Sequence, residues 1–238
     1  MDAATTISSI GLANHVLAAV PRQAYRRMLP SLEAVELIYG QVLYEPLDPI
    51  RHVYFPIDCL VSLLTAVDER RTLEVGMVGS EGMVGMPMAL GIGVSAVRAL
   101  VQGGGTALRM TAAHFRAELK RNQPLQRALF RYNHLLMAQI SQTAACNRFH
   151  EAEARLARWL LMTSDRLQTN EFTLTHEFLA HMLGVRREGV TKAASALHRK
   201  KLIDYRRGKI TILNRKDLEG AACTCYGIVK NLQDVAQV

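Results

Sequence analysis

A stretch of 43 residues, 125–167, contains neither glycine nor proline, and it therefore favours continuous helix. Small or apolar residues recur within it every three or four positions, which places them along one face of a helix. That stripe runs through Leu125, Leu129, Tyr132, Leu136, Ile140, Thr143 and Asn147. We predict a helix of more than about 20 residues, roughly 30 Å long, that breaks near 147–151 and resumes over 152–166.

The stripe can face either the chain's own core or a second copy of the chain. Stripes of this kind more often lie in a core, but a helix that joins two regions of different character can also pack against its twin. We therefore predict a dimer interface. Its residues are Leu125, Leu129, Tyr132, Leu136, Ile140 and Thr143.

Residues 31–111 carry short apolar runs that are rich in β-branched and aromatic side chains, with prolines and glycines between them. The runs cover 35–37, 41–44, 52–55, 60–65, 72–78, 96–101 and 106–110. This spacing predicts an antiparallel β-roll or barrel, followed by a helix over 112–120. We expect an α+β protein with a β-roll domain over 1–122, a dimerisation helix over 123–148 and a further domain over 149–238.

The net charge of +8 is concentrated in one segment of the chain. Residues 172–217 hold eleven Lys or Arg against four Asp or Glu, whereas residues 1–171 hold 17 against 15. A local positive surplus suits a polyanion, because phosphate contacts release condensed counterions. A solubilising face would have the same composition, so charge alone leaves both interpretations open.

The segment 175–201, THEFLAHMLGVRREGVTKAASALHRKK, carries the most specific pattern in the chain. Thr175 can cap a first helix, and Gly184 can end that helix in a left-handed conformation. Ala180 would lie where two helices cross, and Val190 would face back into the pair. This spacing is typical of a helix-turn-helix, with an ordinary helical hairpin as the alternative.

The exposed positions of the second helix carry side chains that can read base edges. They are Arg186, Arg187, Glu188, Thr191 and Lys192. Arginine can bind guanine O6 and N7 with two hydrogen bonds, and glutamate can accept from cytosine N4. Two β-like runs around Gly208 predict a wing hairpin, whose Arg206, Arg207 and Lys209 would contact phosphates. We therefore predict a C-terminal winged helix-turn-helix that binds DNA.

Residues 174–213 resemble the cyclic-AMP-receptor and fumarate-nitrate-reduction (Crp/Fnr) regulators, most specifically through GVRREGVTKAASAL at 184–197. A looser resemblance covers residues 10–215, including HVYFP at 52–56. It implies a cyclic-nucleotide-binding-like β-roll that binds an effector, and a dimerisation helix. By position the family's recognition arginine falls on Arg187, its glutamate on Glu188 and a further basic contact on Lys192. Arg186 departs from the small hydroxyl residue often found there.

The nucleotide site that this resemblance implies is not matched by the chain. The family pairs a glutamate that binds ribose with a later Arg-Ser or Arg-Thr, whose arginine binds the phosphate. Met86 stands in place of the glutamate, and Arg98 precedes Ala99. A cyclic phosphate without its arginine loses a charged hydrogen bond worth roughly 1.5 to 3 kcal/mol. We predict a signal other than cyclic AMP, with an unidentified small-molecule effector or none.

The sequence predicts no metal and no cofactor. An iron–sulfur centre needs several thiolates close together, and the N-terminal half offers only Cys59. Cys223 and Cys225 would point to different faces of a helix, so we expect packing rather than ligation. His176 and His181 lack the acidic motif of a zinc site, which favours surface placement.

No catalytic motif stands out, so we predict no enzymatic activity and no catalytic residues. No apolar run approaches the roughly 18 to 20 residues of a membrane helix, and the expected location is the cytoplasm. Double-stranded DNA and a second copy of the chain are the expected partners, with RNA polymerase a further candidate. We predict a sequence-specific transcription regulator that binds a palindromic operator as a homodimer. The alternative is a signalling or assembly protein that keeps the β-roll and the helix without specific DNA readout.

Overall fold

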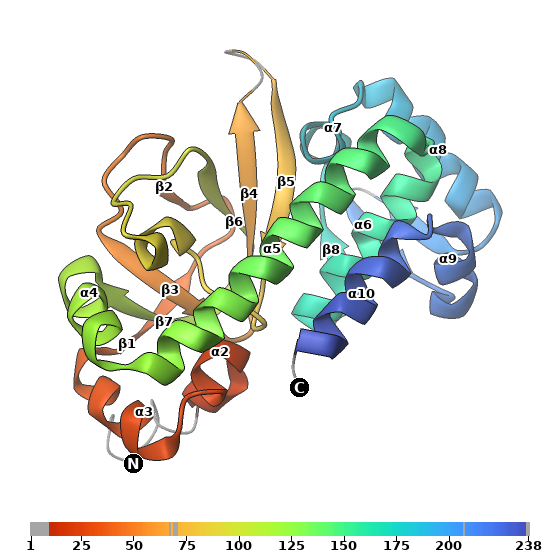
Figure 1. Cartoon of the computed structure of the whole chain (residues 1–238). Coiled ribbons are helices and arrows are strands. Elements are labelled where there is room, and N and C mark those ends of the chain that lie inside the picture. The colour runs from red at the N-terminus through yellow and green to blue at the C-terminus, as the bar shows by residue number, and fades with distance from the viewer. Residues whose placement is uncertain (1–9, 67, 69–70, 207, 237–238) are drawn as a thin grey trace. The chain divides into compact units, whose positions relative to one another are not determined.

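The computed structural model describes residues 10–66, 68, 71–206 and 208–236, which fall into two compact units. The first unit contains residues 10–63 and 77–137, and the second contains 64–76 and 138–236. Two elements continue from one unit into the other, the β4–β5 hairpin and the long helix α5 (green in Figure 1). No helix formed by the described residues is long and apolar enough to cross a membrane.

The first unit is built on antiparallel strands, as the sequence predicts. The strands of the two sheets are β1 (Glu33–Leu37), β2 (Val42–Tyr44), β3 (His52–Pro56), β4 (Leu60–Ala66), β5 (Thr72–Val78), β6 (Arg98–Gly103) and β7 (Gly105–Thr111). One sheet has the order β1-β7-β3 and the other the order β2-β6-β4-β5. Each apolar run of the sequence therefore overlaps a strand, and the expectation of a β-roll is confirmed.

Short helices precede the strands. They are η1 (Gly11–Ala13), α2 (His15–Ala18), α3 (Arg22–Met28) and η2 (Leu29–Ser31). Asn14 is fully buried, and its Oδ1 accepts from the Leu17 N–H at 3.2 Å to cap α2. Its Nδ2 donates to the carbonyls of Pro56 at 3.0 Å and Gly82 at 2.8 Å. One side chain thus fixes α2 to the end of β3 and to the loop after β5, since an unpaired buried carbonyl is costly.

The predicted helices follow β7. They are α4 (Ala112–Arg121) and α5 (Gln123–Phe149), after which α6 (Ala152–Leu167) begins. Thr111 caps α4, and the Oδ1 of Asn122 accepts from the Leu125 N–H at 3.1 Å in the first turn of α5. The helix therefore breaks between Phe149 and Ala152, where the sequence predicts it.

One face of α5 is buried within the chain. Leu125 and Leu129 are 0% exposed, Tyr132 is 4% exposed and Leu136 is 7% exposed. Side chains buried this far within one chain leave little surface for a second copy, and their place in a dimer interface stays a prediction. Ile140 and Thr143 are half-buried. The spacing identified a buried face, but periodicity does not show what buries it.

The second unit places helices around a small sheet. Its further elements are β8 (Glu171–Thr173), α7 (His176–Leu183), α8 (Arg187–Arg199), β9 (Ile203–Arg206), β10 (Lys209–Ile212), α9 (Arg215–Ala221) and α10 (Cys225–Ala236). The sheet has the order β8-β10-β9, and both pairings are antiparallel. The hairpin of β9 and β10 is the predicted wing. Strand β8 was not predicted, because three residues are too short to show an alternating pattern.

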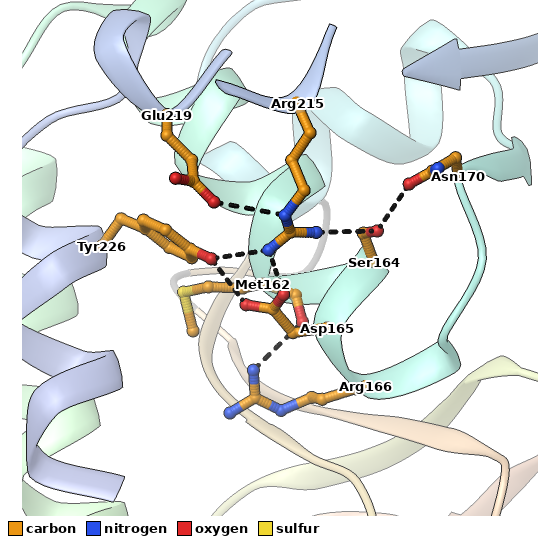
Figure 2. A network of polar contacts seen from close by, with 8 residues as sticks. All are labelled: Met162, Ser164, Asp165, Arg166, Asn170, Arg215, Glu219 and Tyr226. Carbon is orange, nitrogen blue, oxygen red and sulfur yellow. Dashed lines mark hydrogen bonds and ion pairs between the residues drawn. The ribbon is translucent and has the colours of Figure 1, made fainter. Parts of the chain in front are cut away.

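A polar network joins three helices of the second unit (Figure 2). The Arg215 guanidinium, at the start of α9, binds the Asp165 carboxylate of α6 and donates to the Tyr226 hydroxyl of α10 at 2.8 Å. The Tyr226 hydroxyl in turn donates to Asp165 at 2.9 Å. Burial, followed by the hydrogen bond with the Asp165 carboxylate, raises the pKa of Tyr226. The C-terminal helix is therefore attached to α6 by directional, charge-assisted hydrogen bonds.

Candidate nucleic-acid interface

The first helix of the pair, α7, begins and ends where its sequence predicts. The Oγ1 of Thr175 accepts from the Phe178 N–H at 3.1 Å, which caps the helix. Gly184 ends it with φ 60° and ψ 39°, the left-handed conformation in which glycine carries no Cβ penalty. The turn to α8 therefore depends on this glycine.

The second helix, α8, has a buried face and an opposite exposed face. The buried residues are Val190, Ala193, Ala194 and Leu197. The exposed residues include Arg187, Glu188, Thr191, Lys192 and Ser195. At about 100° per residue the exposed set covers one continuous arc of the helix. Ser195 was not among the predicted residues, although it lies one turn beyond Thr191 on the same face.

The positive charge at the beginning of α8 is free to meet an anion. Arg186 is the exposed N-cap residue and makes no side-chain capping bond. Within the described part of the chain, no hydrogen bond or ion pair holds the side chains of Arg186, Arg187 or Lys192. The helix N-terminus adds a partial positive charge and unpaired N–H groups. This end of α8 therefore has the chemistry of a site for phosphate and for acceptor groups of bases.

Thr191 has a structural role between the helices. Its hydroxyl donates to the Arg187 carbonyl at 3.0 Å, and its oxygen lies 3.0 Å from the His176 Nδ1 of α7. The His176 ring also stacks on Tyr205 of the wing, with ring centroids 4.4 Å apart. Burial, followed by the Arg187 charge, lowers the pKa of His176. His176 is thus half-buried and links α7, α8 and β9, whereas the sequence predicted surface placement.

The wing presents basic side chains in exposed ion pairs. Arg206 Nε lies 3.1 Å from the Asp204 carboxylate, and its side chain is 82% exposed. Lys209 Nζ lies 2.6 Å from the Glu171 carboxylate, and both side chains are 55% exposed. Such exposed pairs contribute little to stability, so a phosphate can replace either carboxylate at low cost. Arg207, the third predicted wing contact, lies outside the described residues.

A buried arginine supports the turn of the helix pair. The Arg155 guanidinium of α6 donates to the Leu183 carbonyl at the end of α7 and to the Asn147 side chain at 2.7 Å. Burial lowers the pKa of Arg155, and its side chain still satisfies a helix carbonyl. The sequence analysis missed this residue. Its signal was a charged residue next to Leu156 within the apolar stripe of α6.

Leu73, from the part of the β4–β5 hairpin that belongs to the second unit, lies against the turn between α7 and α8. A Cβ added to Gly184 would lie 2.6 Å from Leu73 Cδ1. The neighbouring Glu74 is buried, and its carboxylate accepts from the Trp159 indole N–H at 2.9 Å. Position 184 therefore favours glycine for a second reason, since the Leu73 side chain occupies the space that a Cβ would need.

The region that corresponds to the nucleotide site of the resemblance lies in the first unit. Met86 is 5% exposed and begins the short helix η3 (Met86–Leu90). The Arg98 Nε lies 2.7 Å from the Glu45 carboxylate. Met86 is therefore apolar where the resemblance implies an acid, and Arg98 already has an anionic partner.

Comparison with known proteins identifies similarity in the second unit at the level of sequence. Residues 154–221 match the family model of the Crp-like helix-turn-helix domain. A comparison with curated protein sequences finds no match.

Solved structures share the fold over most of the chain. TTHB099, a CRP-family transcriptional regulator from Thermus thermophilus, is 20% identical with a TM-score of 0.67, over 79% of this chain and 96% of that one. FixK2 from Bradyrhizobium japonicum is 15% identical with a TM-score of 0.68, over 81% and 98%. The c-di-GMP responsive regulator CLP from Xanthomonas campestris is 18% identical with a TM-score of 0.66, over 81% and 99%. The chain thus shares the fold of these CRP/FNR-type structures, and residues 154–221 match the Crp-like helix-turn-helix domain.

We predict that Gly184→Ala lowers the free energy of unfolding by at least about 1 to 2 kcal/mol, the cost of a left-handed residue that carries a Cβ. The contact with Leu73 adds to that cost. Gly220→Ala is the matched control, because Gly220 lies within α9 with nothing within 4 Å of an added Cβ. It should leave stability unchanged or raise it by up to about 1 kcal/mol. Urea unfolding followed by circular dichroism measures both, and equal effects would contradict the assignment.

Proposed function

Because residues 154–221 form a Crp-like helix-turn-helix domain, we propose that the chain is a sequence-specific transcription regulator that binds a palindromic operator as a homodimer. The observation that carries the proposal is the unpaired positive charge at the N-terminal end of α8, on the face opposite its buried residues. A helix of this kind enters the major groove with its N-terminal residues against base edges. The protein therefore acts by binding rather than by catalysis.

The side chains of the interface divide into two groups in this proposal. Arg187 and Glu188 read base edges, because they lie in the first turn of α8 and are exposed. Arg206 and Lys209 contact phosphates from the wing, which positions the domain without reading sequence. The Thr191 hydroxyl is engaged by its own chain, which leaves its methyl group for contact with a thymine methyl. Arg186 and Lys192 add positive charge to the same face.

A second copy of the chain is proposed to pack on the exposed face of α5. Phe130 is 55% exposed and Met137 is 61% exposed, and Ala144 is also exposed on the same helix. These three positions are seven residues apart, which is the repeat of a two-helix seam. The half-buried Ile140 lies beside this seam. A two-fold axis along α5 would require a palindromic operator with half-sites about 34 to 36 Å apart.

The signal is proposed to be something other than cyclic AMP. The ribose hydroxyls would meet Met86, which is apolar and buried. The cyclic phosphate would have to displace Glu45 from Arg98, so its contact with the arginine would replace an ion pair that the chain already makes. A different small molecule, or no ligand, agrees better with this site.

We predict that Arg187→Ala weakens binding to the preferred operator by about 1 to 3 kcal/mol and weakens binding to a scrambled duplex less. Lys209→Ala is the contrasting variant. It should weaken both duplexes alike and lower the slope of log K against log salt by about one unit. Fluorescence anisotropy titrations at several salt concentrations measure both effects. Equal losses on the two duplexes for Arg187→Ala would show that this residue only binds phosphate.

We predict that a double variant, Phe130→Asp with Met137→Asp, is monomeric at micromolar concentration, because two facing carboxylates cannot be buried without partners. Leu47→Asp is the control, since Leu47 is 75% exposed and lies in a loop of the first unit. It should leave the dimer intact. Light scattering during gel filtration measures the mass. A monomeric unmodified protein, or an unchanged dimer in the double variant, would refute the interface.

We predict that isothermal titration calorimetry with cyclic AMP gives no binding heat in the low micromolar range. The physical reason is the missing acid at Met86 and the engaged Arg98. Tight binding at one nucleotide per chain would contradict this part of the proposal while leaving DNA binding untouched.

A further inference from the structure

Four potential metal ligands meet in the second unit at a place that the DNA interface does not use. Cys146 lies in the last turn of α5, His150 directly follows that helix, Cys223 precedes α10 and Cys225 begins it. Their ligand atoms all lie within 4.8 Å of one another. Cys146 and Cys223 have sulfurs 3.4 Å apart, and Cys225 Sγ lies 3.5 Å from His150 Nδ1. The three cysteines are buried and the histidine is half-buried.

The sequence analysis expected Cys223 and Cys225 to pack rather than to act as ligands, because two thiols at this spacing in a helix need not converge, whereas the structure brings both close to Cys146 and His150. Cys223 is in the turn before α10 rather than within a helix, so the rule for residues two apart on one helix does not apply. Cys146 and His150 are four residues apart, and the His150 N–H donates to the Cys146 carbonyl at 3.1 Å. Helical geometry therefore continues to His150 and places both side chains on one side.

We propose that Cys146, His150, Cys223 and Cys225 bind one zinc ion in a tetrahedral Cys3His site. Zinc–sulfur bonds of about 2.3 Å and zinc–nitrogen bonds of about 2.0 to 2.1 Å place tetrahedral ligands roughly 3.5 to 3.8 Å apart. The 3.4 Å and 3.5 Å distances already agree with this spacing to within a few tenths of an ångström, and the other ligand atoms, all within 4.8 Å of one another, need to approach by about 1 Å at most. Ligand atoms this close together can surround a single metal ion but leave no room for an iron–sulfur cluster. Among single ions, a tetrahedral site rich in sulfur ligands favours zinc.

The residues around the cluster suit an anionic site. Zinc with three thiolates carries a net charge of −1, and binding passes the thiol protons to solvent. Buried Arg158 and Arg155 lie near enough to Cys146 to interact with its charge. The Gln142 amide donates to Cys225 Sγ at 3.0 Å, as outer-shell partners of a metal ligand do.

The site would hold the C-terminal segment in place. It joins the end of α5 to the turn that precedes α10, and the half-buried Ala154 of α6 packs against the cysteines. Because α6 packs against α8 and α9, the metal would support the scaffold on which the helix pair is built. A disulfide between Cys146 and Cys223 is the competing use of two of these sulfurs, but it would give Cys225 and His150 no role.

The first test is the metal content of the full-length protein, made in zinc-supplemented medium and purified under reducing conditions without chelator. Elemental analysis should find one zinc per chain. Replacement by Co²⁺ should give the d–d bands of tetrahedral cobalt and a thiolate-to-cobalt charge-transfer band. Protein free of zinc that also gives no such cobalt spectrum, with its cysteines free or with Cys146 and Cys223 in a disulfide, would overturn the proposal.

The second test assigns the ligands. Cys225→Ser and His150→Asn should each weaken zinc binding by more than the roughly 10- to 100-fold that loss of an outer-shell partner costs. The matched controls are Cys59→Ser, a buried thiol of the first unit, and His134→Asn, an exposed histidine of α5. Both should retain one zinc per chain. Full zinc affinity in the two ligand variants would overturn the assignment of these ligands. If a variant fails to fold, the zinc content of the unmodified protein still tests the proposal.

Discussion

Burial of one face of α5 is the constraint on which the rest of the structure depends. Leu125 and Leu129, in the part of the helix that belongs to the first unit, are fully buried, and so is Cys146 in the part that belongs to the second. A single helix therefore contributes to both cores, and burying each large apolar side chain is worth roughly 1.5 to 3 kcal/mol. Because that face is buried within the chain, we propose the exposed face of the helix, with Phe130 and Met137, as the surface for a second copy.

The DNA interface combines an exposed basic surface with a polar support beneath it. Arg187 and Lys192 are exposed and unpaired among the described residues. Behind them, Arg155 satisfies the carbonyl of Leu183 at the turn, and His176 connects the two helices to the wing. Buried polar groups of this kind are costly to leave unpaired, so these contacts fix the geometry with which the exposed side chains would meet DNA in the proposed complex.

Most local features of the fold were predictable from the sequence. The caps at Thr175 and Gly184, the break after Phe149 and the strand-forming runs all depend on residues within a few positions of each other. Hydrophobic periodicity likewise identified the buried faces of α5 and α8. β8 was missed because pairing with β10, rather than its own pattern, makes it a strand.

The sequence by itself determined the helix-turn-helix, the wing and the location of the positive charge, because spacing and turn chemistry act over short distances along the chain. Only the tertiary structure decided which surface buries the α5 stripe, that Arg155 supports the turn, and that Cys146 meets Cys223 and Cys225. These contacts join residues that are far apart in sequence. Their proximity follows from how helices pack on one another, and no local pattern of residue types encodes that packing.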